Sequence, residues 1–256
     1  MTLRFACLGT GSRGNAVVVV AGRTTVLVDC GFSLRETGRR LLRVGLRLED
    51  LSAVLVSHEH SDHCAGVARL AQRSGLSIYA THGTLQASGL QGLPRARAIA
   101  PDQRFALDGL EIQAYPLPHD AREPCQFVLG DGCHRLGLVT DAGHVSAHMQ
   151  RLLDGCDALL LETNHDPHML ARGPYPPALK ARVGSAYGHL SNAQGADLLS
   201  RIDTSRLQHL VAGHLSEQNN TPLQARAALA GALGCAPEWV AVADQQQGLP
   251  WRELSG

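Results

Sequence analysis

The chain has 256 residues, no net formal charge at pH 7, 44% hydrophobic residues and 18% charged residues. This composition suits a globular protein with a core, and the lack of any run of eighteen apolar residues excludes a membrane-spanning helix. A net charge of zero gives no overall attraction to nucleic acid, although a local basic patch could still provide one.

Length and cysteine usage predict one domain, residues 1–256, in the cytoplasm. A chain of this size is compatible with a single α/β unit. The seven cysteines are odd in number, scattered and free of any Cys-x-x-Cys pair, which indicates reduced thiols rather than a disulfide framework. The first residues lack the basic stretch and apolar segment of a secretory signal.

The predicted elements alternate between strands and helices along the chain. Short apolar or β-branched runs bounded by Gly, Pro or Asp predict strands, and Ser or Thr three residues before Glu or Gln predicts a helix start. In chain order we expect strands at Leu3–Cys7, Val17–Val20 and Thr24–Val28; a helix at Ser33–Val44 with a Ser33/Glu36 capping box; a strand at Ala53–Val56; a helix from about Gly66 to Arg73; strands at Ser77–Ala80, Leu110–Leu117, Gln126–Leu129, Leu136–Thr140 and Ala158–Glu162; a helix opening at Ser191; a strand at Leu207–Ala212; a helix opening at Thr221; and a strand at Trp239–Ala243. This order indicates an α/β protein without a linker or an internal repeat.

A Gly-x-Gly-x-x-Gly motif, Gly9 to Gly14, follows the first predicted strand. A dinucleotide site needs a helix directly after such a motif, whereas here an alanine and four valines follow and indicate a strand. We therefore expect no dinucleotide cofactor and a turn between two strands. Two interpretations of the turn stay open: a plain hairpin, or a nest of backbone N–H groups in which Ser12 and Asn15 face a substrate phosphate.

The segment SHEHSDHCAG, after the fourth predicted strand, carries the most information. Four candidate metal ligands, His58, His60, Asp62 and His63, fall within six positions there. Imidazole and carboxylate groups suit zinc, manganese and iron. His58 and His60 can bind one ion from an extended chain, and Asp62 and His63 can bind another from the following turn. The alternative is a His-rich polar surface loop, which fits poorly because its flanks are apolar.

His-x-His-x-Asp-His after an apolar strand resembles the signature of the metallo-β-lactamase superfamily. The resemblance implies an αββα sandwich, in which two mixed β-sheets lie between helices. It also implies two divalent metal ions, Zn²⁺ or Mn²⁺, with a bridging hydroxide that hydrolyses the substrate. Three further ligands follow downstream in that family: a His at a strand end, an Asp that bridges the metals, and a last His.

The chain offers a candidate for each downstream ligand in that order. His119 follows a predicted strand, and His134 and His144 are its nearby rivals. Asp141 ends a very apolar strand, where a carboxylate is costly to bury unless it is paired or coordinated. A helix N-cap is the alternative for Asp141. His214 follows Leu-Val-Ala-Gly and matches the last motif.

The resemblance thus assigns the roles of the metal site. It gives His58, His60 and His119 to one metal, Asp62, His63 and His214 to the other, and Asp141 to both. Asp62 is also counted as catalytic, because it accepts a hydrogen bond from the hydroxide. Asp29, at the end of the third predicted strand, is expected to support the metal loop rather than to ligate.

Two other residues resemble the acid–histidine pair of the tRNase Z branch. Glu162 ends a predicted strand in Leu-Leu-Leu-Glu-Thr-Asn-His-Asp, and His189 precedes a capped helix in Gly-His-Leu-Ser-Asn. In that branch the His protonates the leaving oxygen and the acid orients it. The alternative is that Glu162 caps a turn and His189 is a helix-entry residue.

Motifs over nearly the whole chain resemble the YycJ/WalJ-type group, which implies an exonuclease-like phosphodiesterase acting on nucleic acid, DNA rather than RNA. Candidates for the substrate edge are Ser12, Asn15, Asn164, His165, Lys180, Ser216 and Asn219. A thioester hydrolase of the glyoxalase II type is one rival, although only about forty residues after His214 leave little room for its helical domain. A non-enzymatic binding member is another, although such members lose ligands.

Overall fold

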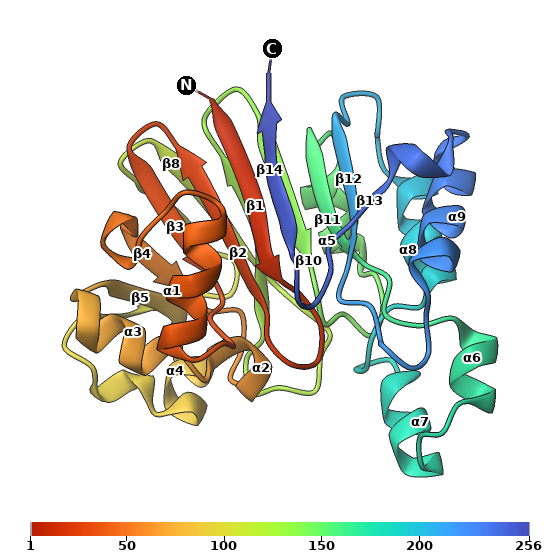
Figure 1. Cartoon of the computed structure of the whole chain (residues 1–256), viewed down its shortest axis with the longest axis horizontal. Coiled ribbons are helices and arrows are strands. Elements are labelled where there is room, and N and C mark those ends of the chain that lie inside the picture. Colours follow the sequence, from red (N-terminus) through yellow and green to blue (C-terminus); the bar gives the residue numbers. More distant parts are fainter. Residues whose placement is uncertain (1, 256) are drawn as a thin grey trace.

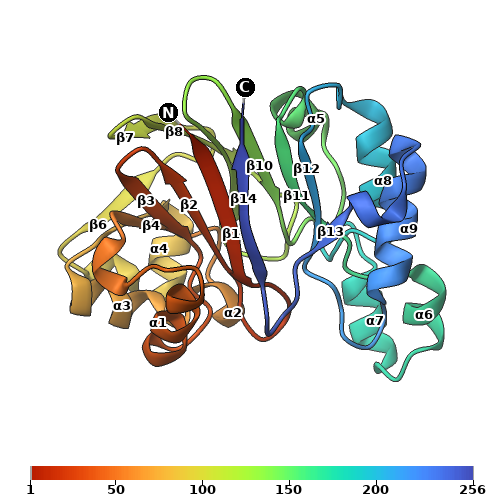
Figure 2. The same ribbon diagram turned by 45° about the horizontal axis from the view of Figure 1, so that its top comes forward.

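The computed structural model describes residues 2–255 and arranges them as two seven-stranded sheets that face each other between helices (Figures 1 and 2). The αββα sandwich predicted above is therefore confirmed. The first sheet runs β14 (Leu249–Leu254), β1 (Leu3–Gly9), β2 (Ala16–Ala21), β3 (Thr24–Val28), β4 (Ala53–Leu55), β5 (Ser77–Thr81), β6 (Ala96–Ile99). The second runs β13 (Ala241–Val242), β12 (His209–Gly213), β11 (Ala158–Glu162), β10 (Arg135–Val139), β9 (Cys125–Gly130), β8 (Leu110–Pro116), β7 (Arg104–Leu107).

Each sheet combines an antiparallel half with a parallel half. The pairings from β14 through β1 and β2 to β3 are antiparallel, and those from β3 to β6 are parallel. The second sheet repeats this pattern, because β7 to β10 pair antiparallel and β10 to β13 pair parallel. The carboxyl ends of neighbouring parallel strands lie at one edge of a sheet, where open α/β sheets usually bind their ligands. The segments after β3, β4, β10, β11 and β12 carry most of the predicted site.

Three apolar layers hold the sandwich together. Phe5, Phe127 and Leu160 belong to the layer between the two sheets. Leu41 belongs to the layer under the helices of the first sheet, and Leu229 to the layer under those of the second. Burying a large aliphatic or aromatic side chain stabilises the fold by roughly 1.5–3 kcal/mol.

The helices lie outside the two sheets, in the segments of chain that connect one strand to the next. The structure has α1 (Leu34–Arg43), α2 (Ser61–Cys64), α3 (Val67–Ser74), α4 (His82–Ser88), α5 (Ala147–Leu153), α6 (Pro167–Arg172), α7 (Pro177–Val183), α8 (Asn192–Arg201) and α9 (Pro222–Leu233), with short 3₁₀ turns at Leu48–Asp50, Leu90–Gly92 and Pro237–Trp239. None of the helices between residues 2 and 255 combines the length and apolarity that a bilayer crossing requires.

The two ends of the chain meet in the first sheet. β14 pairs antiparallel with β1, and Leu254 lies opposite Leu3. Figure 1 accordingly shows the N and C ends side by side. The last strand therefore covers an edge of β1 that would otherwise offer unpaired N–H and C=O groups.

Most predicted elements appear within a residue or two of their expected bounds, but two details were wrong. Trp239 was expected to begin a strand, yet it ends a 3₁₀ turn, and the strand is only Ala241–Val242. The Ser33 side chain caps α1 as expected, but the Glu36 carboxylate does not complete a capping box, because it bonds to Arg39 and Arg40. Elements that the sequence did not predict are β6, β7, β14 and five helices, α2 and α4 to α7.

Candidate metal centre and active-site cavity

The metal loop after β4 is anchored by Asp29. Its Oδ1 accepts the Ser57 N–H at 2.8 Å, and its Oδ2 accepts the Ser57 hydroxyl at 2.8 Å. Oδ2 also lies 2.8 Å from His63 Nδ1. All three residues are buried, so the carboxylate ties the two ends of the loop together. Sequence reasoning expected this support from Asp29 but overlooked Ser57, whose hydroxyl also lies 3.0 Å from His58 Nδ1.

The Gly-rich turn between β1 and β2 is a second support of the loop. The Asn15 N–H donates to the Asp62 carbonyl at 2.7 Å, and the Asn15 amide nitrogen lies 2.9 Å from His63 Nε2. The backbone at Gly31 also lies against the metal loop. A Cβ at this position would lie 1.8 Å from the Asp62 carbonyl oxygen. Only a glycine at position 31 lets the two backbones approach this closely.

The expected turn between two strands is confirmed, because β1 and β2 pair antiparallel. The alternative of a phosphate nest finds little support in the contacts of the turn. The N–H groups of Gly11, Arg13, Gly14 and Asn15 all have partners inside the protein. Asn15 is buried and bonds to the metal loop, so only Ser12 of this turn reaches the cavity described below.

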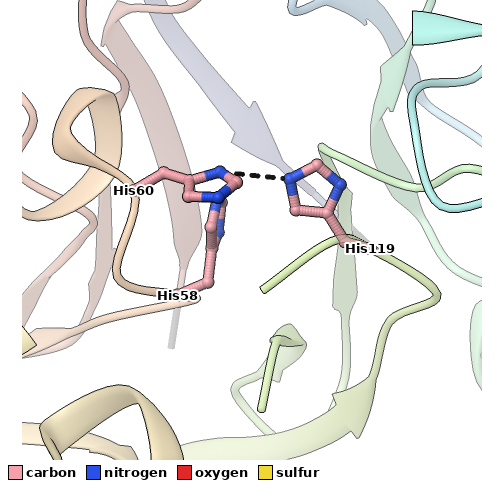
Figure 3. A group of neighbouring side chains, drawn as sticks. All are labelled: His58, His60 and His119. Atoms are coloured by element: carbon pink, nitrogen blue, oxygen red, sulfur yellow. Dashed lines mark hydrogen bonds between the residues drawn. The ribbon is translucent and has the colours of Figure 1, made fainter. Parts of the chain in front are cut away.

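The first candidate ligand group consists of three histidines (Figure 3). His60 Nδ1 and His119 Nε2 lie 3.3 Å apart, and Nε2 of the buried His58 has no hydrogen-bond partner within residues 2–255. The His119 ring is oriented by its Nδ1, which lies 3.1 Å from the Gly188 carbonyl oxygen. One nitrogen of each ring lies within 4.8 Å of the others, as ligands of one ion would.

The second candidate group consists of Asp62, His63 and His214, whose ligand atoms also lie within 4.8 Å of one another. Nδ1 of His63 is held by Asp29, and Nδ1 of His214 lies 2.9 Å from Glu162 Oε1. A histidine ligand usually donates its second ring nitrogen to a carboxylate in this way, which fixes the tautomer. Nε2 of the buried His214 has no hydrogen-bond partner within residues 2–255.

Asp141 lies between the two groups. Its Oδ2 lies 2.9 Å from His63 Nε2, but the angles do not allow a hydrogen bond between them. Its Oδ1 lies 3.9 Å from His119 Nε2. Burial raises the pKa of the Asp141 carboxyl, but the positive charges of His214 and His63 outweigh it and hold the pKa well below its usual value. The carboxylate is therefore charged and directed at both histidine groups.

Backbone strain marks the same residues. Asp29, Asp141 and His214 have left-handed φ angles of 62°, 60° and 54°. Such a residue costs on the order of 1–3 kcal/mol and persists where its surroundings hold it in place. Asp29 and His214 directly follow a strand with a parallel neighbour, and Asp141 follows such a strand after Thr140. Each of the three turns its side chain to the site. Asp108, in a hairpin away from the site, is the other non-glycine residue with this geometry within the described chain.

The chemistry of these donors fits divalent metal. Three buried ligand atoms, on His58, Asp141 and His214, have no hydrogen-bond partner within residues 2–255. Leaving a buried polar atom unsatisfied costs roughly 1–3 kcal/mol, and a cation at the two groups would satisfy all three. Imidazole nitrogens with carboxylate oxygens are the ligands that zinc and manganese take. The residues present are therefore suited to hold divalent ions.

Glu162 joins the metal groups to His189. Its Oε1 lies 2.9 Å from His189 Nδ1 as well as from His214 Nδ1, and its Oε2 accepts the Ala142 N–H at 2.8 Å. Burial lowers the pKa of His189, but the charge of Glu162 and its hydrogen bond outweigh it and raise the pKa. Burial likewise raises the pKa of Glu162, and the His189 charge outweighs it and lowers that pKa. A protonated His189 on an ionised Glu162 is thus the favoured pairing.

A cavity of about 280 Å³ opens over the ligand groups. It is lined by Ser12, His60, Asp62, His119, Asp120, Asp141, Asn164, Tyr175, Leu179, Arg182, Val183, Gly188, His189, His214 and Ser216. Three lining residues with polar side chains, Asp120, Tyr175 and Arg182, were not among the sequence-based candidates. Asp120 lies in the loop after β8, Tyr175 between α6 and α7, and Arg182 on α7. The hydrophobic pattern predicted neither α6 nor α7, and it does not show which way these segments face.

The predicted substrate-edge residues divide into two sets. Ser12, Asn164 and Ser216 line the cavity, but Asn15, His165, Lys180 and Asn219 do not. His165 and Asn219 are buried in the fold, and the Asn219 amide donates to the Ser216 hydroxyl at 3.3 Å. The Lys180 ammonium donates to the Ala171 carbonyl at 2.7 Å and so joins α7 to α6. The expectation that these four contact substrate finds no support in their positions.

The family described as "Beta-lactamase superfamily domain" matches residues 24–210, most of the sandwich and most of the proposed ligands. The chain belongs to the metallo-β-lactamase superfamily. With the ligand groups described above, membership of this superfamily makes it a metal-dependent hydrolase. The resemblance that the sequence suggested is thus confirmed.

Two relatives place the chain more closely within the superfamily. It is 34% identical over 242 residues to the exodeoxyribonuclease YycJ of Bacillus anthracis, covering 91% of this chain and 90% of that protein. It is 33% identical over 223 residues to the exodeoxyribonuclease WalJ of Streptococcus pneumoniae, covering 85% of this chain and 83% of that protein. It is a member of the YycJ/WalJ-type group.

Among solved structures, the metallo-β-lactamase fold protein YhfI from Bacillus subtilis is similar to this chain, with a TM-score of 0.77. The sequences are 18% identical, and the superposition covers 99% of this chain and 100% of the other. At this identity the likeness shows the fold alone.

Proposed function

We propose that the chain is a dinuclear metallohydrolase that cleaves phosphodiester bonds at the ends of DNA. The observation that carries the proposal is the pair of converging ligand groups that share Asp141, in a chain 34% identical to a protein named as an exodeoxyribonuclease. His58, His60 and His119 would hold one metal, Asp62, His63 and His214 would hold the other, and Asp141 lies between the two groups.

Two divalent ions at these groups would act as Lewis acids on a phosphoryl oxygen and make water nucleophilic at neutral pH. The chain contributes the fixed surroundings of that chemistry. Asp29 and Glu162 hold His63 and His214 by their second ring nitrogens, so their remaining nitrogens stay directed at the centre. The Asp62 carboxylate can also accept a hydrogen bond from the attacking water.

His189 acts as the general acid. Its Nδ1 is held by Glu162, which leaves Nε2, on the other side of the ring, as the nitrogen available to the cavity. A sugar oxygen leaves slowly as an alkoxide, so a proton donated from Nε2 accelerates its departure. Glu162 orients the ring and stabilises its charged form. Ser12, Asn164 and Ser216 bind the substrate strand at the rim.

A comparison of three substrates with purified protein tests the proposal. We expect shortening of 5′-phosphorylated duplex DNA with Mn²⁺ or Zn²⁺, slower action on single-stranded RNA, and no turnover of S-lactoylglutathione. Cleavage of the RNA in preference to the DNA would refute the choice of DNA. Turnover of the thioester alone would replace the phosphodiesterase by the glyoxalase-type reaction, and inactivity on all three with metal bound would favour a binding protein.

We also propose that the protein works in the cytoplasm as one unit spanning residues 1–256. Seven free thiols, none of them in a disulfide, support a reducing compartment. The pairing of β14 with β1 supports a single unit, because the last residues complete the first sheet. Labelling of intact cells with a membrane-impermeant reagent tests the compartment, and labelling of the native protein in such cells would refute it.

A further inference from the structure

Arg182 is the sole arginine or lysine that lines the cavity, as far as residues 2–255 show. It lies near the end of α7, and its side chain is 58% exposed. Figures 1 and 2 show α6 and α7 together at the end of the sandwich that also carries α2 of the metal loop. Arg182 thus lies on the wall of the cavity that also contains His60, Asp62 and His214.

Asp120 holds the guanidinium in place. Arg182 Nε donates to Asp120 Oδ2 at 2.5 Å, while Asp120 Oδ1 lies 3.4 Å from His119 Nε2. The Asp120 N–H donates to the Tyr187 carbonyl at 3.1 Å, which fixes this segment as well. Within the described chain Asp120 is the only side-chain partner of the guanidinium, so its two NH₂ groups stay free for a ligand.

The backbone between Arg182 and His189 folds back on itself. The His189 N–H donates to the Val183 carbonyl at 2.9 Å. A Cβ at Gly188 would meet that carbonyl oxygen at 2.2 Å, so the turn needs glycine there. One short segment therefore brings the guanidinium and the proposed general acid to the same wall of the cavity.

The charges of the cavity indicate what Arg182 binds. Asp62 and Asp141 are used by metal in the proposed function, whereas Arg182 keeps a free planar fork of donors. Such a fork matches the oxygens of a phosphate and binds them in a bidentate fashion. The Asp120 carboxylate stands between this fork and His119, so a phosphate on Arg182 is separate from a phosphate at the ligand groups.

We propose that Arg182, held by Asp120, binds a second phosphate of the substrate strand, next to the phosphodiester that is hydrolysed. The inference rests on the proposed function and adds a subsite to it. It explains why the arginine of the cavity is held in place by Asp120, the residue that follows the proposed ligand His119. A substrate with a single phosphodiester group has nothing to place there.

The test compares Arg182→Gln with Arg172→Gln in the metal-loaded protein. Arg172 ends the adjacent helix α6, is exposed and does not line the cavity, so its variant controls for lost overall charge. Charge-assisted hydrogen bonds of this kind correspond to roughly 10–100-fold in binding. We expect Arg182→Gln to raise the KM for a short oligodeoxynucleotide by about that factor. The KM of the control should stay at the wild-type value.

Two further substrates make the result specific. Bis(p-nitrophenyl) phosphate, with a single phosphodiester, should be turned over equally by Arg182→Gln and wild type, which also reports an intact fold and metal centre. Oligodeoxynucleotides with one neutral methylphosphonate linkage, moved along the strand, should show one position beyond the cleaved bond at which wild type loses affinity. Arg182→Gln should be insensitive to the substitution at that position.

Failure of the inference and of the proposed function give different results. Wild-type cleavage of oligodeoxynucleotides, with an unchanged KM in Arg182→Gln, overturns the Arg182 subsite alone. An equal rise of KM in both arginine variants also overturns it, because general charge then explains the effect. A wild type that turns over bis(p-nitrophenyl) phosphate but neither binds nor cleaves oligonucleotides overturns both proposals together.

Discussion

Replacing His189 with alanine is the sharpest test of the proposed chemistry. The imidazole bonds to Glu162 through Nδ1 and lines the cavity. A general acid contributes roughly 10²–10⁴-fold to a rate, or about 2.7–5.4 kcal/mol of the barrier. We therefore expect His189→Ala to slow cleavage of a natural phosphodiester by that range. The rate with bis(p-nitrophenyl) phosphate should change little, because p-nitrophenolate leaves without a proton.

The structure predicts that this variant keeps its fold and its metal. After loss of the imidazole, Glu162 Oε1 retains His214 at 2.9 Å, and Oε2 retains the Ala142 N–H at 2.8 Å. No buried charge is left without a partner, so the cost to stability is small. His148→Ala is a suitable control, because His148 is on α5 and pairs with the exposed Asp102.

Three measurements decide the outcome: single-turnover rates on both substrates, metal content by elemental analysis, and the midpoint of thermal unfolding. Loss of a metal from His189→Ala would show that His189 is a metal ligand. Its ring lies close enough to Asp141, Glu162 and His214 for that role. An equal fall in rate on both substrates would refute the general acid and leave His189 with a structural role. Glu162→Gln should give the same pattern as His189→Ala, more weakly.

The remaining predictions concern metal, its support and the thiols. Protein never exposed to chelator should contain two divalent ions per chain by elemental analysis, and Asp62→Ala should lose hydrolysis; one ion or none in the wild type would contradict the dinuclear site. Asp29→Ala removes the acceptor for both Ser57 and His63, so metal affinity measured by titration calorimetry should fall about 10–100-fold, and an unchanged affinity would exclude its supporting role. Alkylation of the native protein at pH 8, read by mass spectrometry, should label the exposed Cys133 first, because burial raises the pKa of Cys7 to about 12 and of Cys30 to about 11; labelling of the buried thiols at an equal rate would contradict this packing.

The metal loop illustrates what local sequence determines. His58 to His63 are so close in the chain that an apolar strand before them is enough to bring them to one place. Asp141 was found from its own position, because a carboxylate at the end of a largely buried strand needs a partner. Glu162 ends a buried strand as well, but family resemblance singled it out. Order along the chain and family resemblance supplied His119 and His214. The structure brings all of these residues together.

Side-chain partners, in contrast, were decided by contacts between distant segments. Glu36 has the spacing of a capping-box residue, yet two arginines on the next turn attract its carboxylate more strongly. Asn15 follows a Gly-rich turn that resembles a phosphate loop, but the metal loop, 47 residues away, takes its amide.

The ligands of the metal centre could be predicted from local sequence, whereas the lining of the cavity depends on contacts between distant segments. The proposed ligands lie in segments that follow strands, and such segments can be recognised from the hydrophobic pattern and from the spacing of histidines. Arg182 reaches the cavity only because α7 folds over it and Asp120 meets the guanidinium. β14, similarly, finds its place beside β1 from the far end of the chain. No pattern within a short window contains these pairings, because each depends on where the backbone of another element lies.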